Sequence, residues 1–247
     1  MEKSIVIIPT YNEKENVPRI VAELFALYPR MHLLIIDDQS PDGTGAVVKQ
    51  LQKDFPDRLY LLERAGKQGL GTAYIAGFRW ALERDYEYIF EMDADFSHPV
   101  KDLLRLYEAC RNGADMAVGS RYTRGGKVSN WPLGRILMSY FASVYVRLIT
   151  WLPVKDTTAG FVCYTRRVLE QLDFSRIRFV GYAFQIEMKY AVWKMGFRIK
   201  EVPITFVDRE AGQSKMSKGI FKEAMRGVWR MRFETGKDYY TGRKKES

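Results

Sequence analysis

Two aspartates and a serine alternate in the segment Asp93-Ala94-Asp95-Phe96-Ser97, directly after an apolar run. In an extended chain, residues 93, 95 and 97 point to one side. Two carboxylates and a hydroxyl on one side make a hard oxygen site that suits Mg²⁺ or Mn²⁺ and leaves room for substrate phosphates. An ordinary acidic turn is the alternative interpretation, and the pattern alone leaves both open. A calcium EF-hand loop is excluded, because its glycine and distal glutamate are missing.

Two polar loops follow apolar runs nearer the N-terminus, Pro-Thr-Tyr-Asn-Glu at 9–13 and Asp-Asp-Gln-Ser-Pro-Asp-Gly-Thr at 37–44. Ligands of open parallel sheets bind beyond the carboxyl ends of the strands, so we expect these loops to lie side by side there. Tyr11 offers a face on which a base can stack, and the carboxylates can accept its N–H groups. Helix N-capping is the alternative for Asn12 and Asp42. We accept capping for Asp42, whereas Asp38 is harder to explain in that way.

A glycine-containing helix start follows at residues 67–72, Lys-Gln-Gly-Leu-Gly-Thr. Such a turn can admit a phosphate or a ribose to the amino end of a helix. It is not a dinucleotide-binding fingerprint, because the third glycine is absent and the segment does not follow the first strand.

Basic residues gather in two later loops, at 119–126 and 209–215, with Arg135 shortly after the first. Arginine in such loops suits two-point binding of phosphate. A solvated basic surface is the alternative, but the flanking glycines and aromatic residues favour a functional role.

Two amphipathic segments, 133–152 and 219–233, combine apolar and basic residues. Their apolar stripes are Leu133, Leu137, Tyr140, Phe141, Val144, Leu148 and Trp151, then Phe221, Met225, Val228 and Trp229. Basic helices with aromatic borders can lie in a membrane interface. Packing against the core is the alternative for each helix taken alone.

The elements that position these loops alternate along the first half of the chain. Apolar runs predict strands, and longer periodic segments predict helices. The strands are expected at 4–9, 32–36, 59–62, 88–92 and 114–119, and the helices at 15–28, 43–55, 71–84 and 100–112. This order predicts an α/β fold with a mostly parallel sheet and helices on both faces. In the second half we expect strands at 161–168 and 199–207, helices at 133–152, 181–195 and 219–233, and a polar tail from 237.

Composition narrows the class of protein. The chain has 247 residues, a formal net charge of +9 and two cysteines, Cys110 and Cys163. The cysteines argue against a disulfide scaffold or structural zinc, and they fit a reducing compartment. The charge implies a polyanionic partner: nucleic acid, anionic lipid or a phosphorylated substrate. No stretch approaches the ~20 uncharged apolar residues of a transmembrane helix.

Taken together, these motifs resemble the family 2 glycosyltransferases of the GT-A fold, and among them the dolichol-phosphate (polyprenyl-phosphate) mannose synthases. The matching segments span nearly the whole chain in a consistent order. They are PTYNE at 9–13, DDQSPDGT at 37–44, GLGTAY at 69–74, DADFSH at 93–98, GSRY at 119–122, DTTAGF at 156–161, GYAFQIEM at 181–188 and the loop at 209–215.

The resemblance implies roles for individual residues. The residues expected to bind the nucleotide sugar are Pro9, Tyr11, Glu13, Asp37, Asp38, Lys67, Gly71 and Asp93. Those expected to hold Mg²⁺ or Mn²⁺ are Asp93, Asp95 and Ser97, although many relatives carry Gln where this chain has Ser97. The acceptor phosphate is expected to contact Arg121, Arg135, Ser139, Arg209 and Lys215. The expected catalytic residues are Asp95, Arg121, Arg209 and Glu187, the last by orienting donor or acceptor.

The implied reaction moves mannose from GDP-mannose to dolichyl or polyprenyl phosphate with inversion at the anomeric carbon. A phosphate monoester loses its second proton near pH ~6, so the nucleophile is ionised without a strong general base. Glucose transfer from UDP-glucose to the same lipid is the nearer alternative. A non-catalytic protein that binds anionic lipid or nucleic acid is the alternative from another class, and it leaves the acidic strand ends unexplained.

The resemblance also implies a place in the cell and a division of the chain. The expected place is cytoplasmic, peripheral on the cytoplasmic face of a membrane, with no nucleic-acid partner and with an accessory membrane subunit as a further possibility. The GT-A domain is expected at 1–235, with a nucleotide-sugar half at 1–122 and an acceptor and membrane-surface half at 123–235. C-terminal amphipathic helices and a polar tail at 236–247 complete it.

Overall fold

The computed structural model describes residues 1–181, 183–208, 218–236 and 238–241, with side chains left out at 218–224 and 226. Within these residues a seven-stranded sheet has the order β3-β2-β1-β4-β7-β5-β8. Its strands are β1 (Ser4–Thr10), β2 (His32–Asp37), β3 (Leu59–Glu63), β4 (Tyr88–Glu91), β5 (Met116–Ser120), β7 (Val162–Thr165) and β8 (Ile199–Pro203). Neighbouring strands are parallel except where β7 pairs antiparallel with β4 and β5. The predicted mostly parallel sheet is confirmed.

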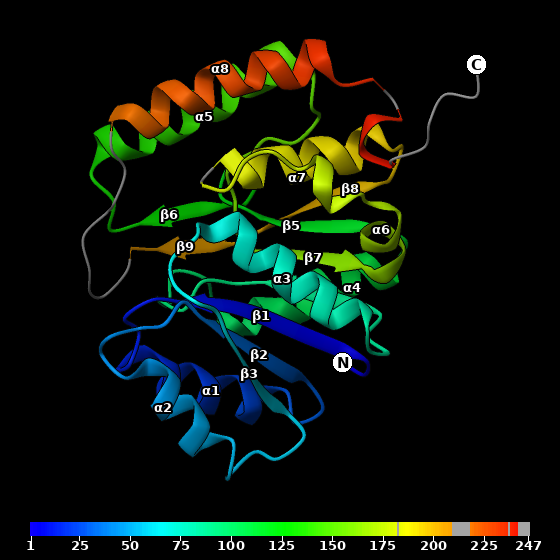
Figure 1. Cartoon of the computed structure of the whole chain (residues 1–247). Coiled ribbons are helices and arrows are strands. Elements are labelled where there is room, and N and C mark those ends of the chain that lie inside the picture. Colours follow the sequence, from blue (N-terminus) through cyan, green and yellow to red (C-terminus); the bar gives the residue numbers. More distant parts are fainter. Residues whose placement is uncertain (182, 209–217, 237, 242–247) are drawn as a thin grey trace.

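Helices cover both faces of this sheet, as predicted (Figure 1). Successive side chains of a strand point to opposite faces. Val6 and Ile8 pack with α1 (Asn16–Leu27), α2 (Thr44–Leu51) and α4 (Leu103–Arg111). Ile5 and Ile7 pack with α3 (Leu70–Leu82), α6 (Arg166–Gln171) and α7 (Ala183–Lys194). The near-continuous apolar sequence of β1 follows from this burial on both sides.

Two long helices, α5 (Leu133–Thr150) and α8 (Lys218–Glu234), lie side by side at one end of the molecule (Figure 1). Beside them, β6 (Lys127–Ser129) and β9 (Thr205–Val207) form a small parallel sheet. Short 3₁₀ turns complete the described fold: η1 (Val100–Asp102), η2 (Phe174–Arg176) and η3 (Tyr239–Thr241).

The second half of the chain departs from the predicted elements in three places. The strand predicted at 161–168 ends at Thr165, and α6 begins at the next residue because Val168 and Leu169 turn inward to the core. The strand predicted at 199–207 is two strands, since Ile204 donates its N–H to Ser120 O and accepts from Lys127 N at the point where the chain leaves the large sheet. The three-residue strand β6 was not predicted.

The polar tail predicted from residue 236 is also shorter than expected. Tyr240 is fully buried, and its ring lies edge-on to Tyr190 with centroids 6.2 Å apart. Its backbone C=O accepts from Asp173 N at 2.8 Å. The packed fold therefore extends to η3, past the predicted domain end at residue 235.

Candidate active site

A cavity of about 430 Å³ lies between the carboxyl ends of β4 and β5 and the helices α5 and α8. We call it the central cavity. Its polar lining includes Asp93, Asp95, Ser97, His98, Arg121, Arg135 and Ser139. Its apolar lining includes Met138, Phe141, Val146, Ile186, Ile204, Met225 and Val228. Residues predicted for metal, sugar and acceptor phosphate thus meet in one space that is apolar on its helical side.

The acidic segment turns sharply after β4 instead of staying extended. Phe96 has φ of 61°, in the left-handed region, and Ser97 donates its backbone N–H to Asp95 Oδ1 at 3.1 Å. The condition of an extended backbone across residues 93–97 is therefore not met. Asp93, Asp95 and Ser97 nevertheless line the same cavity, while the guanidinium of Arg19 lies 4.5 Å from the Phe96 ring centroid.

The Ser97 hydroxyl fits a site that needs one more ligand. Its side chain is only 1% exposed, and its Oγ has no hydrogen-bond partner within the described residues. A buried hydroxyl without a partner costs free energy, so such an atom points to a missing cation or water. The described residues contain no cluster of three His, Cys, Asp or Glu side chains in metal-binding geometry. Two carboxylates plus this hydroxyl fit Mg²⁺ or Mn²⁺, which accept water and phosphate as further ligands.

His98 supports this segment from within the fold. Its ring stacks on Phe161 with centroids 5.1 Å apart, and its Nδ1 accepts from the backbone N–H of Asp93 at 3.4 Å. Burial lowers the pKa of His98 to about 4, and nearby Arg121 acts in the same direction. The imidazole is therefore neutral at pH 7, and the proton is assigned to Nε2 because Nδ1 accepts.

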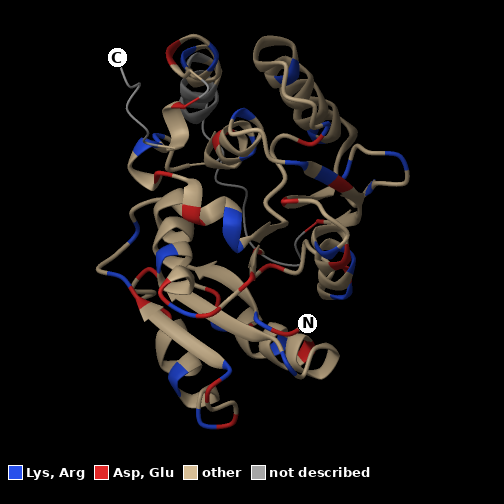
Figure 2. Ribbon diagram, turned by 90° about the vertical axis from the view of Figure 1, so that its right-hand side faces the viewer, with Lys and Arg blue, Asp and Glu red and all other residues tan. Residues whose placement is uncertain are grey.

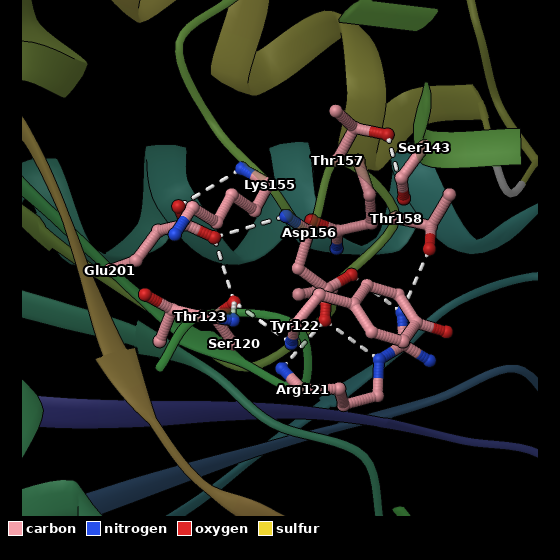
Figure 3. A network of polar contacts seen from close by, with 12 residues as sticks. Ser120, Arg121, Tyr122, Thr123, Ser143, Lys155, Asp156, Thr157, Thr158 and Glu201 are labelled. Atoms are coloured by element: carbon pink, nitrogen blue, oxygen red, sulfur yellow. Dashed lines mark hydrogen bonds and ion pairs between the residues drawn. The ribbon is translucent and has the colours of Figure 1, made fainter. Parts of the chain in front are cut away.

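Arg121 is fixed by a buried ion pair with Asp156 (Figure 3). Asp156 Oδ2 accepts from Arg121 Nε at 2.7 Å and from its backbone N at 2.8 Å, while Oδ1 accepts from Nη2 at 2.6 Å. Thr158 Oγ1 accepts a further bond from Nη2 at 2.8 Å. Burial alone would raise the pKa of Asp156, but Arg121 reverses the effect and the pKa is lowered. Both groups are therefore charged at neutral pH.

Glu201 on β8 holds the loop that carries Asp156 (Figure 3). Its carboxylate accepts from the backbone N–H groups of Asp156 at 3.0 Å and Lys155 at 2.9 Å, and from Ser120 Oγ at 2.7 Å. The bonds of the Arg121 side chain to Asp156 and Thr158 come from Nε and Nη2, and the residue also lines the central cavity. Glu201 was not singled out from the sequence, since it bonds to residues 45 or more positions away.

Arg135 reaches the same cavity from α5. Its guanidinium lies 4.1 Å from the Trp131 ring centroid, and Asp208 Oδ1 accepts from Arg135 Nη1 at 3.1 Å and Trp131 Nε1 at 3.0 Å. Ser139 lines the cavity one turn along α5. Arg209 and Lys215, predicted to bind the acceptor phosphate, lie outside the described residues.

The predicted nucleotide loops do lie together at the carboxyl ends of β1, β2 and β3. Lys67 Nζ lies 4.7 Å from the Tyr11 ring centroid. Asp38 accepts two bonds from largely buried Arg64, Oδ1 from Nε at 2.6 Å and Oδ2 from Nη2 at 2.7 Å. Arg64 Nη1 also donates to Thr72 Oγ1 at 2.8 Å, so these contacts join the three loops to the amino end of α3. Arg64 was not predicted from the sequence, because it stands in no recognisable motif and its partner Asp38 is 26 positions away.

Other residues predicted for the nucleotide have structural partners. Asp37 accepts from Thr10 Oγ1 and from Ser40, so its carboxylate holds the turn after β2. Glu13 accepts from Asn16 Nδ2 at 2.7 Å, and Pro9 lies within β1 opposite Ile36. Asp42 accepts from Thr44 N at 2.9 Å, but the residue at the N-cap of α2 is Gly43, with φ of 88°. Asp42, predicted as the N-cap, therefore lies one residue before the N-cap position of α2.

Glu187, which was predicted to orient donor or acceptor, does not line the central cavity. Its Oε2 accepts from the backbone N–H groups of Arg178 at 2.8 Å and Phe179 at 2.9 Å, and its Oε1 accepts from Tyr240 OH at 3.4 Å. It is absent from the lining of the cavity, because the face of α7 that points there carries Ala183 and Ile186.

The outer surface of α5 is strongly apolar. Leu133 and Leu148 on α5 and Trp151 directly after it are more than half exposed, and on α8 so is Phe233. The charged residues of α5 are Arg135 and Arg147, and the α5 ribbon is correspondingly almost all tan (Figure 2). Among the described helices, none combines the length and the hydropathy needed to span a bilayer.

The sequence of this chain is similar to those of known glycosyltransferases. The family model described as "Glycosyl transferase family 2" matches residues 5–173. A polyprenol monophosphomannose synthase of Mycolicibacterium smegmatis is 48% identical over 91% of this chain and 84% of its own length. An undecaprenyl-phosphate mannosyltransferase of Micrococcus luteus is 46% identical over 92% of both chains.

A solved structure shares the fold. It is a mannosyltransferase from Pyrobaculum calidifontis in complex with GDP-Man and Mn²⁺, with a TM-score of 0.56, 17% identity, and coverage of 93% of this chain and 69% of that one. At that identity the likeness concerns the fold alone.

Proposed function

Because this chain belongs to glycosyltransferase family 2, we propose that the central cavity transfers mannose from GDP-mannose to a polyprenyl phosphate. The observation that carries the proposal is the composition of the cavity. Its lining brings Asp95, Ser97 and Arg121 together with many apolar residues of α5 and α8. A sugar diphosphate and a lipid phosphate need these two environments at one place. The mannosyltransferase relatives support the same donor and acceptor class.

The reaction needs two anions held in line, the acceptor phosphate and the donor diphosphate. Arg121 is preorganised by Asp156, so it can bind an acceptor oxygen without reorganising at the moment of transfer. Arg135 lies at the same cavity and adds positive charge. The acceptor phosphate is already ionised near neutral pH, so it needs no general base. The imidazole of His98 is neutral at this pH and takes no proton from the acceptor. Attack on the anomeric carbon from the side opposite the diphosphate gives inversion.

A divalent cation fits the donor side. Asp95, Asp93 and Ser97 would hold Mg²⁺ or Mn²⁺, which supplies positive charge to the departing diphosphate when bound. The unpartnered Ser97 Oγ supports this assignment from the structure. Tyr11 and Lys67, with Asp38 held by Arg64, form the side of the site where the nucleotide would lie.

The proposed lipid acceptor also implies a location for the enzyme at a membrane. The exposed apolar residues of α5 and α8 flank the apolar side of the cavity, and such helices insert shallowly at the interface of a bilayer. We place the enzyme peripherally on the cytoplasmic face of a membrane. There the polyprenyl chain stays in lipid while its phosphate enters the cavity.

Transfer of radiolabelled mannose from GDP-mannose into organic-extractable polyprenyl phosphate tests the proposal. Label in the lipid phase with Mn²⁺, abolished by EDTA, is the expected result. Transfer from UDP-glucose but not GDP-mannose would replace the proposed donor. Absence of transfer from both donors would remove the proposed activity altogether.

A further inference from the structure

Residues 178–180 join two distant parts of the fold, and we call them the bridging segment. At its Phe179 end the segment packs against α8, where a Cβ added to Gly227 would lie 2.1 Å from Phe179 Cζ. At its other end, Val180 O accepts from the backbone N–H of Gly71 at 2.8 Å. Gly71 is in the first turn of α3. The segment therefore spans from the C-terminal helix to the donor side of the site.

Glu187 fixes the position of the bridging segment. Its Oε2 accepts from two consecutive backbone N–H groups, of Arg178 and Phe179, at 2.8 and 2.9 Å. The Glu187 side chain is only 1% exposed, and Tyr240 OH donates to its other oxygen at 3.4 Å. A buried carboxylate costs free energy unless hydrogen bonds compensate it. Here all three of these bonds restrain the segment or the C-terminal turn η3.

The C-terminal side of the fold holds the segment a second time. Arg178 Nη1 donates to Glu234 Oε2 on α8 at 2.6 Å, and Arg178 Nε donates to Tyr239 OH at 2.8 Å. The segment is thus clamped between α7, α8 and η3. These exposed contacts add little free energy singly, so the buried Glu187 is the main restraint.

The amino end of α3 tolerates little movement of the segment. A Cβ on Gly71 would lie 2.8 Å from Phe179 O, and a Cβ on Gly69 would lie 2.8 Å from Val180 O. The next residue, Thr72, accepts from Arg64, which holds Asp38. A shift of the bridging segment therefore reaches the loops proposed to bind the nucleotide.

We infer that Glu187 and Gly227 are positioning residues that set the affinity for the nucleotide of the donor, acting through the bridging segment on the amino end of α3. The inference rests on the proposed function for the identity of the donor. It makes the orienting role predicted for Glu187 an indirect one, and it couples the helix that lines the acceptor side to the donor side.

The test compares Glu187→Ala with Glu187→Gln, because the glutamine amide oxygen can still accept from both backbone N–H groups. Calorimetric binding of GDP with Mn²⁺ is measured beside the KM for GDP-mannose and kcat. We expect Glu187→Ala to weaken GDP binding and raise this KM about 10-fold, with kcat at saturation within about 3-fold of wild type. Glu187→Gln should stay within about 3-fold in every quantity. Tyr240→Phe, which removes only the longest bond, is the matched control and should bind GDP normally.

Gly227→Ala forces the Phe179 ring to move, and we infer that this movement shifts the bridging segment from its other side. We expect it also to weaken GDP binding by several-fold. Gly134→Ala is its matched control, since a Cβ there meets nothing within 4 Å on another long helix, α5. GDP binding by Gly134→Ala should equal that of wild type.

Three outcomes overturn the inference. Equal losses of kcat in Glu187→Ala and Glu187→Gln with unchanged GDP binding would make Glu187 catalytic. A lower melting temperature with unchanged GDP binding would make it a stabilising residue alone. Normal GDP binding by Gly227→Ala would mean that α8 is not coupled to the donor side of the site. If wild type binds GDP but transfers no mannose, the proposed function fails while the GDP measurements still decide this inference.

Discussion

The guanidinium of Arg121 and the carboxylate of Asp156 form a two-point ion pair, Nε–Oδ2 2.7 Å and Nη2–Oδ1 2.6 Å, in which both side chains are almost completely buried. Arg121 follows β5 and lines the central cavity, whereas Asp156 lies in the loop before β7. A buried arginine without its partner would be an uncompensated charge. The pair therefore has two effects. It holds the two loops together, and it fixes the guanidinium of Arg121 at the cavity wall.

Asp156→Asn should be severely damaging for that reason. Asparagine keeps the shape but leaves the Arg121 charge unbalanced, so we expect a loss of about 3–5 kcal/mol in the free energy of unfolding. Mannose transfer at a temperature where the variant is folded should fall at least ~100-fold, because the cation loses its fixed orientation. Urea denaturation and the transfer assay measure the two effects. Thr158→Val, which removes only one bond to Arg121, should cost much less in both, and equal damage from the two variants would contradict this account.

The unpartnered hydroxyl of Ser97 leads to an unusual combination of effects. Removing a buried polar group that makes no hydrogen bond relieves its desolvation cost. Ser97→Ala should therefore be at least as stable as wild type without metal, while the Mn²⁺ concentration for half-maximal transfer rises several-fold. Metal titration of activity and denaturation in EDTA provide the measurements. Ser143→Ala is the comparison for stability, since Ser143 is equally buried but accepts from Thr157 Oγ1 at 3.3 Å. An unchanged metal requirement in Ser97→Ala would remove Ser97 from the metal site.

The sequence predicted the first half of this fold well because its signals are local. Each buried strand from β1 to β5 is an apolar run closed by a polar loop, and the structure places these strands within a residue or two of the prediction. The turn at Thr165 was missed because the predicted strand was carried across Arg166 and Arg167 to Val168, which points into the core from α6. Periodicity does not separate a short buried helix from the end of a strand.

The site shows the same division between local and distant signals. Asp95 and Ser97 are two positions apart in the sequence, and both line the cavity. No local sequence pattern predicts the residues that support the site. Arg64 bonds to Asp38 across 26 positions, and Glu201 bonds to Ser120 across 81. Glu187 was assigned to catalysis from its motif, and its position against the bridging segment favours an indirect role.

Glu187 also predicts a pH dependence of stability. Burial raises its pKa above the ordinary 4.5, and its backbone hydrogen bonds oppose but do not cancel the shift. The folded state then binds this proton more tightly than the unfolded state, so the contribution to stability is full at low pH and is lost as pH rises through the folded pKa. Wild type should lose stability relative to Glu187→Gln as the pH rises from 4.5 through the raised pKa of Glu187. Urea denaturation of both proteins across this range measures the difference, and a difference that does not vary with pH would contradict the assigned burial effect.

The outer face of α5 predicts how the enzyme meets its lipid substrate. Leu148 is 72% exposed and Trp151 68% exposed, and both lie outside the lining of the central cavity. Replacing both with Glu removes apolar contact and adds repulsion from anionic lipid, so sedimentation with vesicles that contain anionic phospholipid should fall at least ~10-fold. Transfer to a short, water-soluble polyprenyl phosphate should stay within about 2-fold of wild type, because the cavity is untouched. Leu27→Glu is the matched control: Leu27 is 47% exposed at the end of α1, in a helix that packs on the sheet away from α5, and this variant should still bind vesicles. Equal loss of vesicle binding in the α5 variant and in Leu27→Glu would mean that added negative charge, and not the face of α5, governs membrane binding. Loss confined to the α5 variant would assign the membrane contact to that helix.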